Sequence, residues 1–196
     1  MKNYWWRRKR TRVRLHLWLK IYKAHVKPVL TYNASTWGLT AKDTENLNVF
    51  HRKQLCKIIG SKASQNSRTI SNQCLYAIAK SKPLTVDITA SRWRILGHLL
   101  RQPLQAPAQR ALSYYCREET DCKRFQGNKR ATIITTINKN IRDTKNRLPN
   151  FTLPPLTNNE QLASFRRIAS NRRSWQEITK LVTGTAQGNY PDLIIV

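Results

Sequence analysis

The chain has 196 residues, of which 36 are Lys or Arg and only 10 are Asp or Glu, so its formal net charge at pH 7 is +26. A chain this basic repels itself unless a polyanion neutralises it, which favours nucleic acid as the partner over an anionic membrane or another acidic partner. Gly and Pro number only 6 and 8, which argues against a low-complexity chain and against an all-β protein built on tight turns.

Residues 1–11 are predicted to form a basic aromatic tail. Tyr4, Trp5 and Trp6 precede a run of cations, and bases can stack on aromatic rings while arginines hold phosphates. The alternative is a flexible tail, or a segment that docks on another protein. Together with Trp5 and Trp6, the candidate nucleic-acid-binding residues here are Arg7, Arg8, Lys9, Arg10, Arg12 and Arg14.

Residues 12–35 are predicted to form a long helix. Leu15, Leu19, Tyr22, Val26 and Val29 recur at helical spacing, and a basic stripe of Lys20, Lys23 and Lys27 lies one position further along. Pro28 should kink or end this helix, because it lacks a backbone donor. No acidic residue precedes Asp43, which favours phosphate binding by the stripe over an ordinary solvated face.

Two further helices are predicted before residue 80. The first begins at Thr40, with Asp43 in the capping-box position, and ends near Gly60. It adds Arg52, Lys53 and Lys57 to the candidate phosphate contacts, and its His51 is interpreted as a histidine at the edge of the core. Residues 71 and 72 cap a second, shorter helix.

A fourth helix is predicted from Pro83 to about residue 101. Trp93 and Gly97 lie one turn apart, so this helix carries a large ring beside a notch that another helix can approach closely. Arg94 and Arg101 flank His98 on one face. They are candidate phosphate contacts, although hydrogen bonding within the fold is the favoured role for His98.

The predicted fold class is all-α. We expect a thumb-like helical domain over 12–101, a linker over 102–130 that holds a short helix around 108–115, a smaller helical extension over 131–184 and an irregular tail over 185–196. Within the extension, residues 132–144 form one predicted helix. A helix or broken pair follows from 159 to 182 and is ended by Gly184.

Catalytic, metal-binding and cofactor-binding residues are not predicted. No two of the aspartates are adjacent, whereas two-metal nucleotidyl transfer needs several carboxylates held together. The cysteines at 56, 74, 116 and 122 match no zinc-binding spacing. No apolar run approaches the roughly 20 residues that span a bilayer, and no secretory signal is recognisable. We therefore expect no membrane partner, reduced thiols, and an intracellular protein of the nucleus or cytoplasm.

Several stretches, taken in order, resemble the region that follows the polymerase core in LINE-type (non-LTR) retrotransposon endonuclease–reverse transcriptases. Each motif is weak alone, and the order and spacing of the set carry the resemblance. The stretches are residues 20–24, 26–30, 32, 36–40, 47–55, 58–60, 70–72, 75–76, 83–84 and 92–101, and more weakly 108–112 and 162–182.

The resemblance implies a thumb and post-thumb region of an RNA-directed DNA polymerase. The family's Tyr-x-Asp-Asp palm and its endonuclease domain have no counterpart in this sequence, so no catalytic residue is carried over and the chain is expected to be a fragment without enzymatic activity. A role in gripping template–primer is carried over onto Lys20, Lys23, Lys27, Arg52 and Lys53. The missing polymerase core becomes a second expected partner, and a free-standing basic RNA- or DNA-binding module, such as a ribosome-associated protein, is the alternative.

Overall fold

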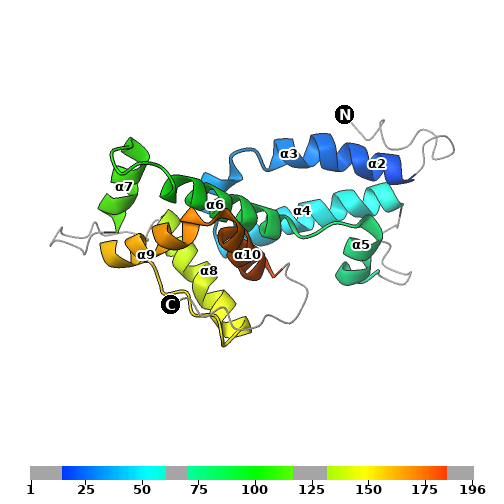
Figure 1. The fold of residues 1–196 in the computed structure, drawn as a ribbon. Coiled ribbons are helices and arrows are strands. Elements are labelled where there is room, and N and C mark those ends of the chain that lie inside the picture. Colours follow the sequence, from blue (N-terminus) through cyan, green and yellow to red (C-terminus); the bar gives the residue numbers. More distant parts are fainter. Residues whose placement is uncertain (1–14, 61–69, 117–131, 185–196) are drawn as a thin grey trace, which may run out of the picture. The chain divides into compact units, whose positions relative to one another are not determined.

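A computed structural model describes residues 15–60, 70–116 and 132–184, and all the regular secondary structure in these ranges is helical (Figure 1). The all-α prediction is confirmed. The chain divides into two compact units. Among the described residues, unit 1 comprises those up to Ala34 together with those of Leu39–Ile88, and unit 2 comprises Ser35–Gly38 together with those from Thr89 onward. None of the described helices is both long enough and apolar enough to cross a membrane.

The helices of unit 1 begin and end where side chains can cap them. Thr40 and Asp43 form the predicted capping box at the start of α4 (Ala41–Ile59), and Gly60 ends it in the left-handed conformation, with φ of 78°. Ser71 accepts a hydrogen bond from the backbone N–H of Cys74 and caps α5 (Asn72–Ala79). The predicted bounds of α4 and the predicted start of α5 are confirmed. Caps are local signals, which is why the sequence shows them.

The first described helix differs from its predicted form. It consists of α2 (Leu15–Ile21), a π-helical turn η1 (Tyr22–Val26) and α3 (Lys27–Leu30). An α-helix through Pro28 would lose one hydrogen bond and drive the proline ring toward the carbonyl of residue 24. The wider turn, in which the backbone N–H of Lys27 donates to the carbonyl of Tyr22, avoids this conflict.

The π-turn adds one residue and so rotates the side chains that follow it. Leu19 and Tyr22 are buried as predicted, but Val26 and Val29 are 39% and 78% exposed. The partly buried residue at the next turn is Lys27 instead of Val26. The helix also ends at Leu30 and not near residue 35.

The core of unit 1 is small and contains a buried polar group. His51 is fully buried, and its ring stacks between those of Tyr22 and Tyr76, at centroid distances of 5.5 and 6.0 Å. Around it the buried apolar side chains are Leu19, Tyr22, Leu55, Ile58, Leu75 and Ala79.

The helix α6 (Leu84–Leu100) begins in unit 1 and continues into unit 2 from Thr89 onward. Unit 2 contains four further helices among the described residues. These are α7 (Pro107–Tyr115), α8 (Ile133–Arg147), α9 (Asn159–Ser170) and α10 (Arg172–Thr183). The predicted broken pair is α9 and α10, which are separated only by Asn171. The Asn171 side chain accepts hydrogen bonds from the backbone N–H groups of Arg173 and Ser174.

Two tryptophans meet at the predicted notch in α6. Trp93 is fully buried, and its ring lies 5.4 Å from that of Trp175 between centroids. The indole N–H of Trp175 donates to the carbonyl of Trp93 at 2.8 Å. A Cβ at Gly97 would lie 2.6 Å from Cδ1 of Trp175, so only glycine admits the ring this closely.

The division between units differs from the predicted domain bounds. The boundary falls inside α6, between Ile88 and Thr89, instead of near residue 101. From Trp93 onward the buried side chains of α6 join the core of α8–α10, and Leu112 and Cys116, in and just after α7, join it too. Among the described residues, the core that α6 shares with α7–α10 is larger than the core of unit 1. A helix that serves two cores carries no sequence signal at the point where one ends and the other begins.

Arg92 attaches an early segment of the chain to unit 2. Its guanidinium is buried and donates to the carbonyls of Ser35, at 3.2 Å, and Trp37, at 2.5 Å. Burial lowers the pKa of this group from its ordinary value. Because a guanidinium keeps its charge in proteins, these carbonyls solvate a permanent cation.

Candidate nucleic-acid interface

The predicted lysine stripe is divided by the π-turn. Lys20 on α2 is exposed. Lys23 instead donates to the carbonyl of Lys80 at 2.7 Å, and Lys27 lies 2.5 Å from the carboxylate of Asp87. Two of the three lysines are therefore engaged within unit 1, and only Lys20 projects as the stripe predicted.

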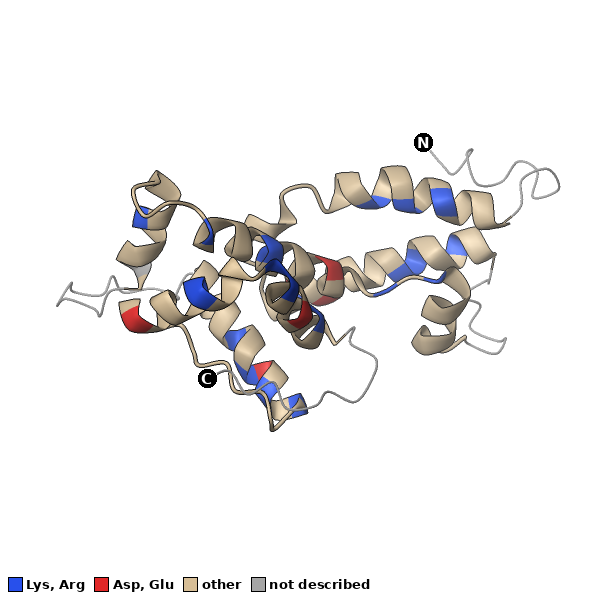
Figure 2. Cartoon of the chain, viewed as in Figure 1, with Lys and Arg blue, Asp and Glu red and all other residues tan. Residues whose placement is uncertain are grey.

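The cations of α4 are divided in the same way. Arg52 bonds to Glu45 at 2.6 Å, and this contact is the main cause that raises the pKa of the guanidinium. Lys53 and Lys57 are exposed and lie one turn apart on the same helix, so they present two positive charges to one side of α4. Figure 2 shows Lys and Arg along the ribbons of α2 and α4.

The acidic residues of unit 1 are all used inside it. Between residues 15 and 88 the sequence has only Asp43, Glu45 and Asp87. Asp43 caps α4, and its bonds to the side chain and backbone of Thr40 lower its carboxyl pKa. Glu45 and Asp87 contact Arg52 and Lys27. Among the described residues of the unit, five further exposed lysines therefore have no carboxylate left over to neutralise them: Lys20, Lys53, Lys57, Lys80 and Lys82.

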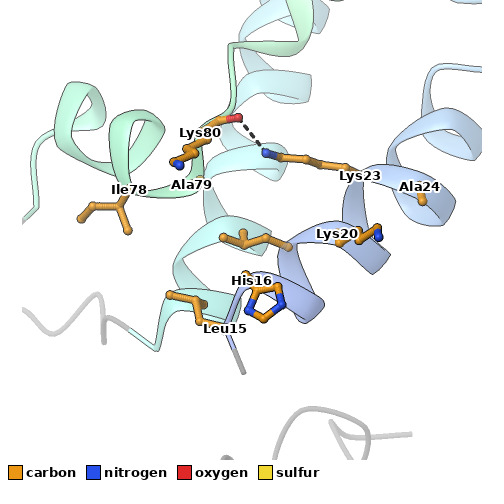
Figure 3. Close-up of a pocket in the computed structure, with 9 residues that line it drawn as sticks. Leu15, His16, Lys20, Lys23, Ala24, Ile78, Ala79 and Lys80 are labelled. Atoms are coloured by element: carbon orange, nitrogen blue, oxygen red, sulfur yellow. Dashed lines mark hydrogen bonds between the residues drawn. The ribbon is translucent and has the colours of Figure 1, made fainter. Parts of the chain in front are cut away.

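An open groove of about 540 Å³ lies between α2 and α5. Its apolar lining comes from Leu15, Leu19, Ala24, Ile78 and Ala79. Its polar lining carries no acid and consists of His16, Lys20, Lys23 and Lys80. Figure 3 shows the Lys23–Lys80 hydrogen bond at one end of the groove and His16 near the other.

His51 lies in the core of unit 1 and links Tyr22 to the carbonyl of Lys82 by hydrogen bonds. Its Nδ1 lies 2.7 Å from the hydroxyl of Tyr22, and its Nε2 lies 3.2 Å from the carbonyl of Lys82. A neutral ring that carries its proton on Nε2 satisfies both contacts, since Nε2 then donates to the carbonyl and Nδ1 accepts from the hydroxyl. Burial, followed by the charge of Lys27, lowers the pKa of His51 to about 4. The sequence-based interpretation placed His51 at the edge of the core, and the structure instead buries its side chain completely.

Two of the predicted site residues lie in unit 2. Arg94 is exposed on α6. Arg101 donates to the carbonyl of Ala169 at 3.1 Å and so binds the C-terminal end of α9. A similar structural role falls to Arg166, which donates to the buried Gln109. Of the predicted pair, only Arg94 projects into solvent.

Half of the predicted site cannot be placed. Residues 1–14 lie outside the described part of the chain, and with them Trp5, Trp6, Arg7, Arg8, Lys9, Arg10, Arg12 and Arg14. Among the residues that the structure does describe, no cluster of His, Cys, Asp and Glu could hold a metal ion. Three of the cysteines are free thiols: Cys56, Cys74 and the buried Cys116.

Two basic features were not found from the sequence. Lys80 ends α5 in the left-handed conformation, with φ of 46°, and this places its carbonyl against Lys23. The one sign of this in the sequence is that the residue at the end of the helix is Lys80 and not a glycine. On α8, Lys139, Arg142 and Lys145 are exposed at steps of three. Their spacing is the same signal that identified Lys20, Lys23 and Lys27, and it was available in the sequence.

No family model, no curated protein and no solved structure matches this chain.

Proposed function

We propose that the chain binds nucleic acid through its phosphates, using the exposed lysines of unit 1. The observation that carries the proposal is the distribution of charge. The acids of this unit are consumed by a helix cap and two ion pairs, while Lys20, Lys53, Lys57 and Lys80 remain exposed. Lysines left in this state attract a polyanion, and the release of its counterions supplies the affinity.

We also propose that this binding is the grip of a reverse-transcriptase thumb on template–primer. The ordered motifs that resemble LINE-type reverse transcriptases support this origin. It implies that a recessed RNA–DNA hybrid is bound more tightly than single-stranded RNA of equal length. It also implies that the chain does not extend a primer. Incorporation of labelled dNTP above a mock purification, with Mg²⁺ or Mn²⁺, would contradict that expectation.

The test measures binding to fluorescently labelled oligonucleotides by anisotropy across a salt series. With about six phosphates neutralised, log K should fall against log salt with a slope of about −4 to −5. Changing Lys20, Lys53 and Lys57 together to Glu should weaken binding to all sequences alike and reduce the slope by about 2 to 3. A flat salt dependence would rule out phosphate binding.

The control changes an equal charge elsewhere. Lys139, Arg142 and Lys145 on α8 are also exposed, so their joint change to Glu alters the net charge by the same amount in unit 2. We expect this variant to bind more tightly than the unit 1 variant. Equal losses would mean that binding follows net charge alone and would contradict an interface on unit 1.

A further inference from the structure

The groove between α2 and α5 exposes large aliphatic side chains to solvent. Leu15 on α2 is 40% exposed and Ile78 on α5 is 47% exposed, whereas Leu19 and Ala79 between them are buried. The groove thus has aliphatic walls and a buried aliphatic floor. Exposed apolar surface that gathers in a concave site marks a place where another apolar surface binds.

The rim of the groove has charge of one sign. Lys20, Lys23 and Lys80 border it, and none of its lining residues is acidic. The pKa of Lys23 is lowered by burial first and then by the charges of Lys27 and Lys80. The rim therefore lacks compensating negative charge, and an occupant with carboxylates would supply it.

The chemistry of the lining selects among the possible occupants. Bases of single-stranded nucleic acid bind by stacking on aromatic rings, whereas the apolar lining of this groove is aliphatic and His16 contributes its one ring. A membrane surface does not enter a concave site between two helices. An amphipathic helix does, because its apolar face fits a groove while its flanking residues reach the rim.

We propose that the groove between α2 and α5 binds an acidic amphipathic helix of a protein partner. Aliphatic side chains of that helix, spaced at i, i+3 or i+4 and i+7, occupy the space between Leu15 and Ile78. Its Glu or Asp side chains contact Lys20 and Lys80. A groove of about 540 Å³ holds a few anchoring side chains, and the body of the helix lies along its mouth. This inference does not depend on the nucleic-acid proposal.

The test uses a designed Leu/Glu peptide of about 18 residues with all its Leu on one helical face. A scrambled isomer of the same composition and a Leu/Lys peptide of the same pattern serve as probes for charge alone and for the opposite charge. Binding is measured by anisotropy at a salt concentration that screens non-specific attraction. We expect the Leu/Glu peptide to bind at least about 10-fold more tightly than its scrambled isomer. Equal binding of the two overturns the proposal.

Matched variants locate the site. Ile78→Gln and Leu15→Gln should each weaken peptide binding about 10-fold, whereas Val29→Gln should change it less than about 2-fold. Val29 is also an exposed aliphatic residue of unit 1, at 78%, but it does not line the groove. Lys20→Glu with Lys80→Glu should weaken the Leu/Glu peptide and strengthen the Leu/Lys peptide. Because all five positions are exposed, each variant should retain the wild-type melting curve.

Other occupants give distinct results. If Ile78→Gln weakens single-stranded RNA as much as it weakens the peptide, the groove is a nucleic-acid site and the proposal fails. It also fails if the variant abolishes self-association in sedimentation, or if anionic vesicles displace the peptide from the wild type alone. RNA affinity that is unchanged in Ile78→Gln, with peptide affinity lost, supports the inference whether or not the lysine interface on unit 1 survives its own test.

Discussion

Each of the two units is stabilised internally by a different kind of interaction. Unit 1 has a small core with a neutral, hydrogen-bonded histidine inside it. Unit 2 has a larger core in which Trp93 and Trp175 pack together, while Arg101 and Arg147 bond to carbonyls near the ends of α9 and α10. Protonation should therefore act on unit 1, and changes of side-chain volume should act on unit 2.

The largest effect is expected at Trp93. Truncation to Ala removes a fully buried ring and should cost about 3–5 kcal/mol. Hydrogen exchange read by mass spectrometry should show lost protection in α8, α9 and α10, with α4 and α5 retained. Trp93→Phe is the milder control, since it keeps a ring and removes an indole N–H that is buried without a hydrogen-bond partner in the described structure. Equal loss of protection in α4 would show that the units unfold as one.

Acid should act mainly on unit 1. His51 is neutral when folded with a pKa of about 4, below the ordinary 6.5, so the unfolded state binds the proton more readily. The stabilising contribution is complete above about pH 6.5 and is lost as pH falls toward 4, by on the order of 2–3 kcal/mol. Exchange in α4 and α5 should rise over this window before that in α9 and α10. His51→Gln, which cannot titrate, should remove the pH dependence, and a wild-type unit 1 that is insensitive to pH would contradict the prediction.

A smaller effect is expected at the notch in unit 2. Gly97→Ala places a Cβ against the Trp175 ring and should cost about 1–3 kcal/mol through displacement of that ring. Ser91→Ala on the same helix is the control, with an expected change within about 0.5 kcal/mol. Thermal melting monitored by tryptophan fluorescence measures both variants. If Gly97→Ala costs as much stability in a Trp175→Phe background as in the wild type, the clash with the Trp175 indole is not the cause.

The smallest effect is expected from the ion pair in unit 1. Lys27 and Asp87 have side chains that are 19% and 39% exposed, so solvent screens their attraction. Lys27→Met should cost at most about 1 kcal/mol, and less at high salt. It should also raise the pKa of His51, because the charge of Lys27 helps to lower it. NMR titration of the His51 ring protons detects that shift. An unchanged midpoint would show that the charge of Lys27 does not affect the pKa of His51.

Local features of this fold were predictable from the sequence. Both ends of α4 and the start of α5 follow from Thr40, Asp43, Gly60 and Ser71, which act on backbone groups within a few residues of themselves. The approach of a helix at Trp93 and Gly97 follows from the pairing of a large residue with a small one. These signals are short-range, and the described structure bears them out.

Features that depend on distant residues were not predictable. The π-turn before Pro28 moves Lys27 toward Asp87, which lies 60 positions further along the chain. Periodicity alone placed Val26 in the core and Lys27 in solvent. The division within α6 was missed for the same reason, because each half of the helix takes its role from the helices packed against it. For the candidate site, the sequence predicted which cationic residues are present. It did not predict which of them form hydrogen bonds or ion pairs within unit 1.

The attachment of Ser35 and Trp37 to Arg92 bears on how the chain is made. Arg92 follows Ser35 by 57 residues, so at ~5–20 residues per second it is added roughly 3–11 s later. In that interval the second part of unit 1, Leu39–Ile88, is synthesised, while residues 35–38 wait for a partner from unit 2. Translation thus delivers residues 35–38, then the residues that complete the small core of unit 1, then the guanidinium that binds the carbonyls of Ser35 and Trp37. A pause after residue 88 would prolong the time for which the carbonyls of Ser35 and Trp37 remain open to water and to chaperones.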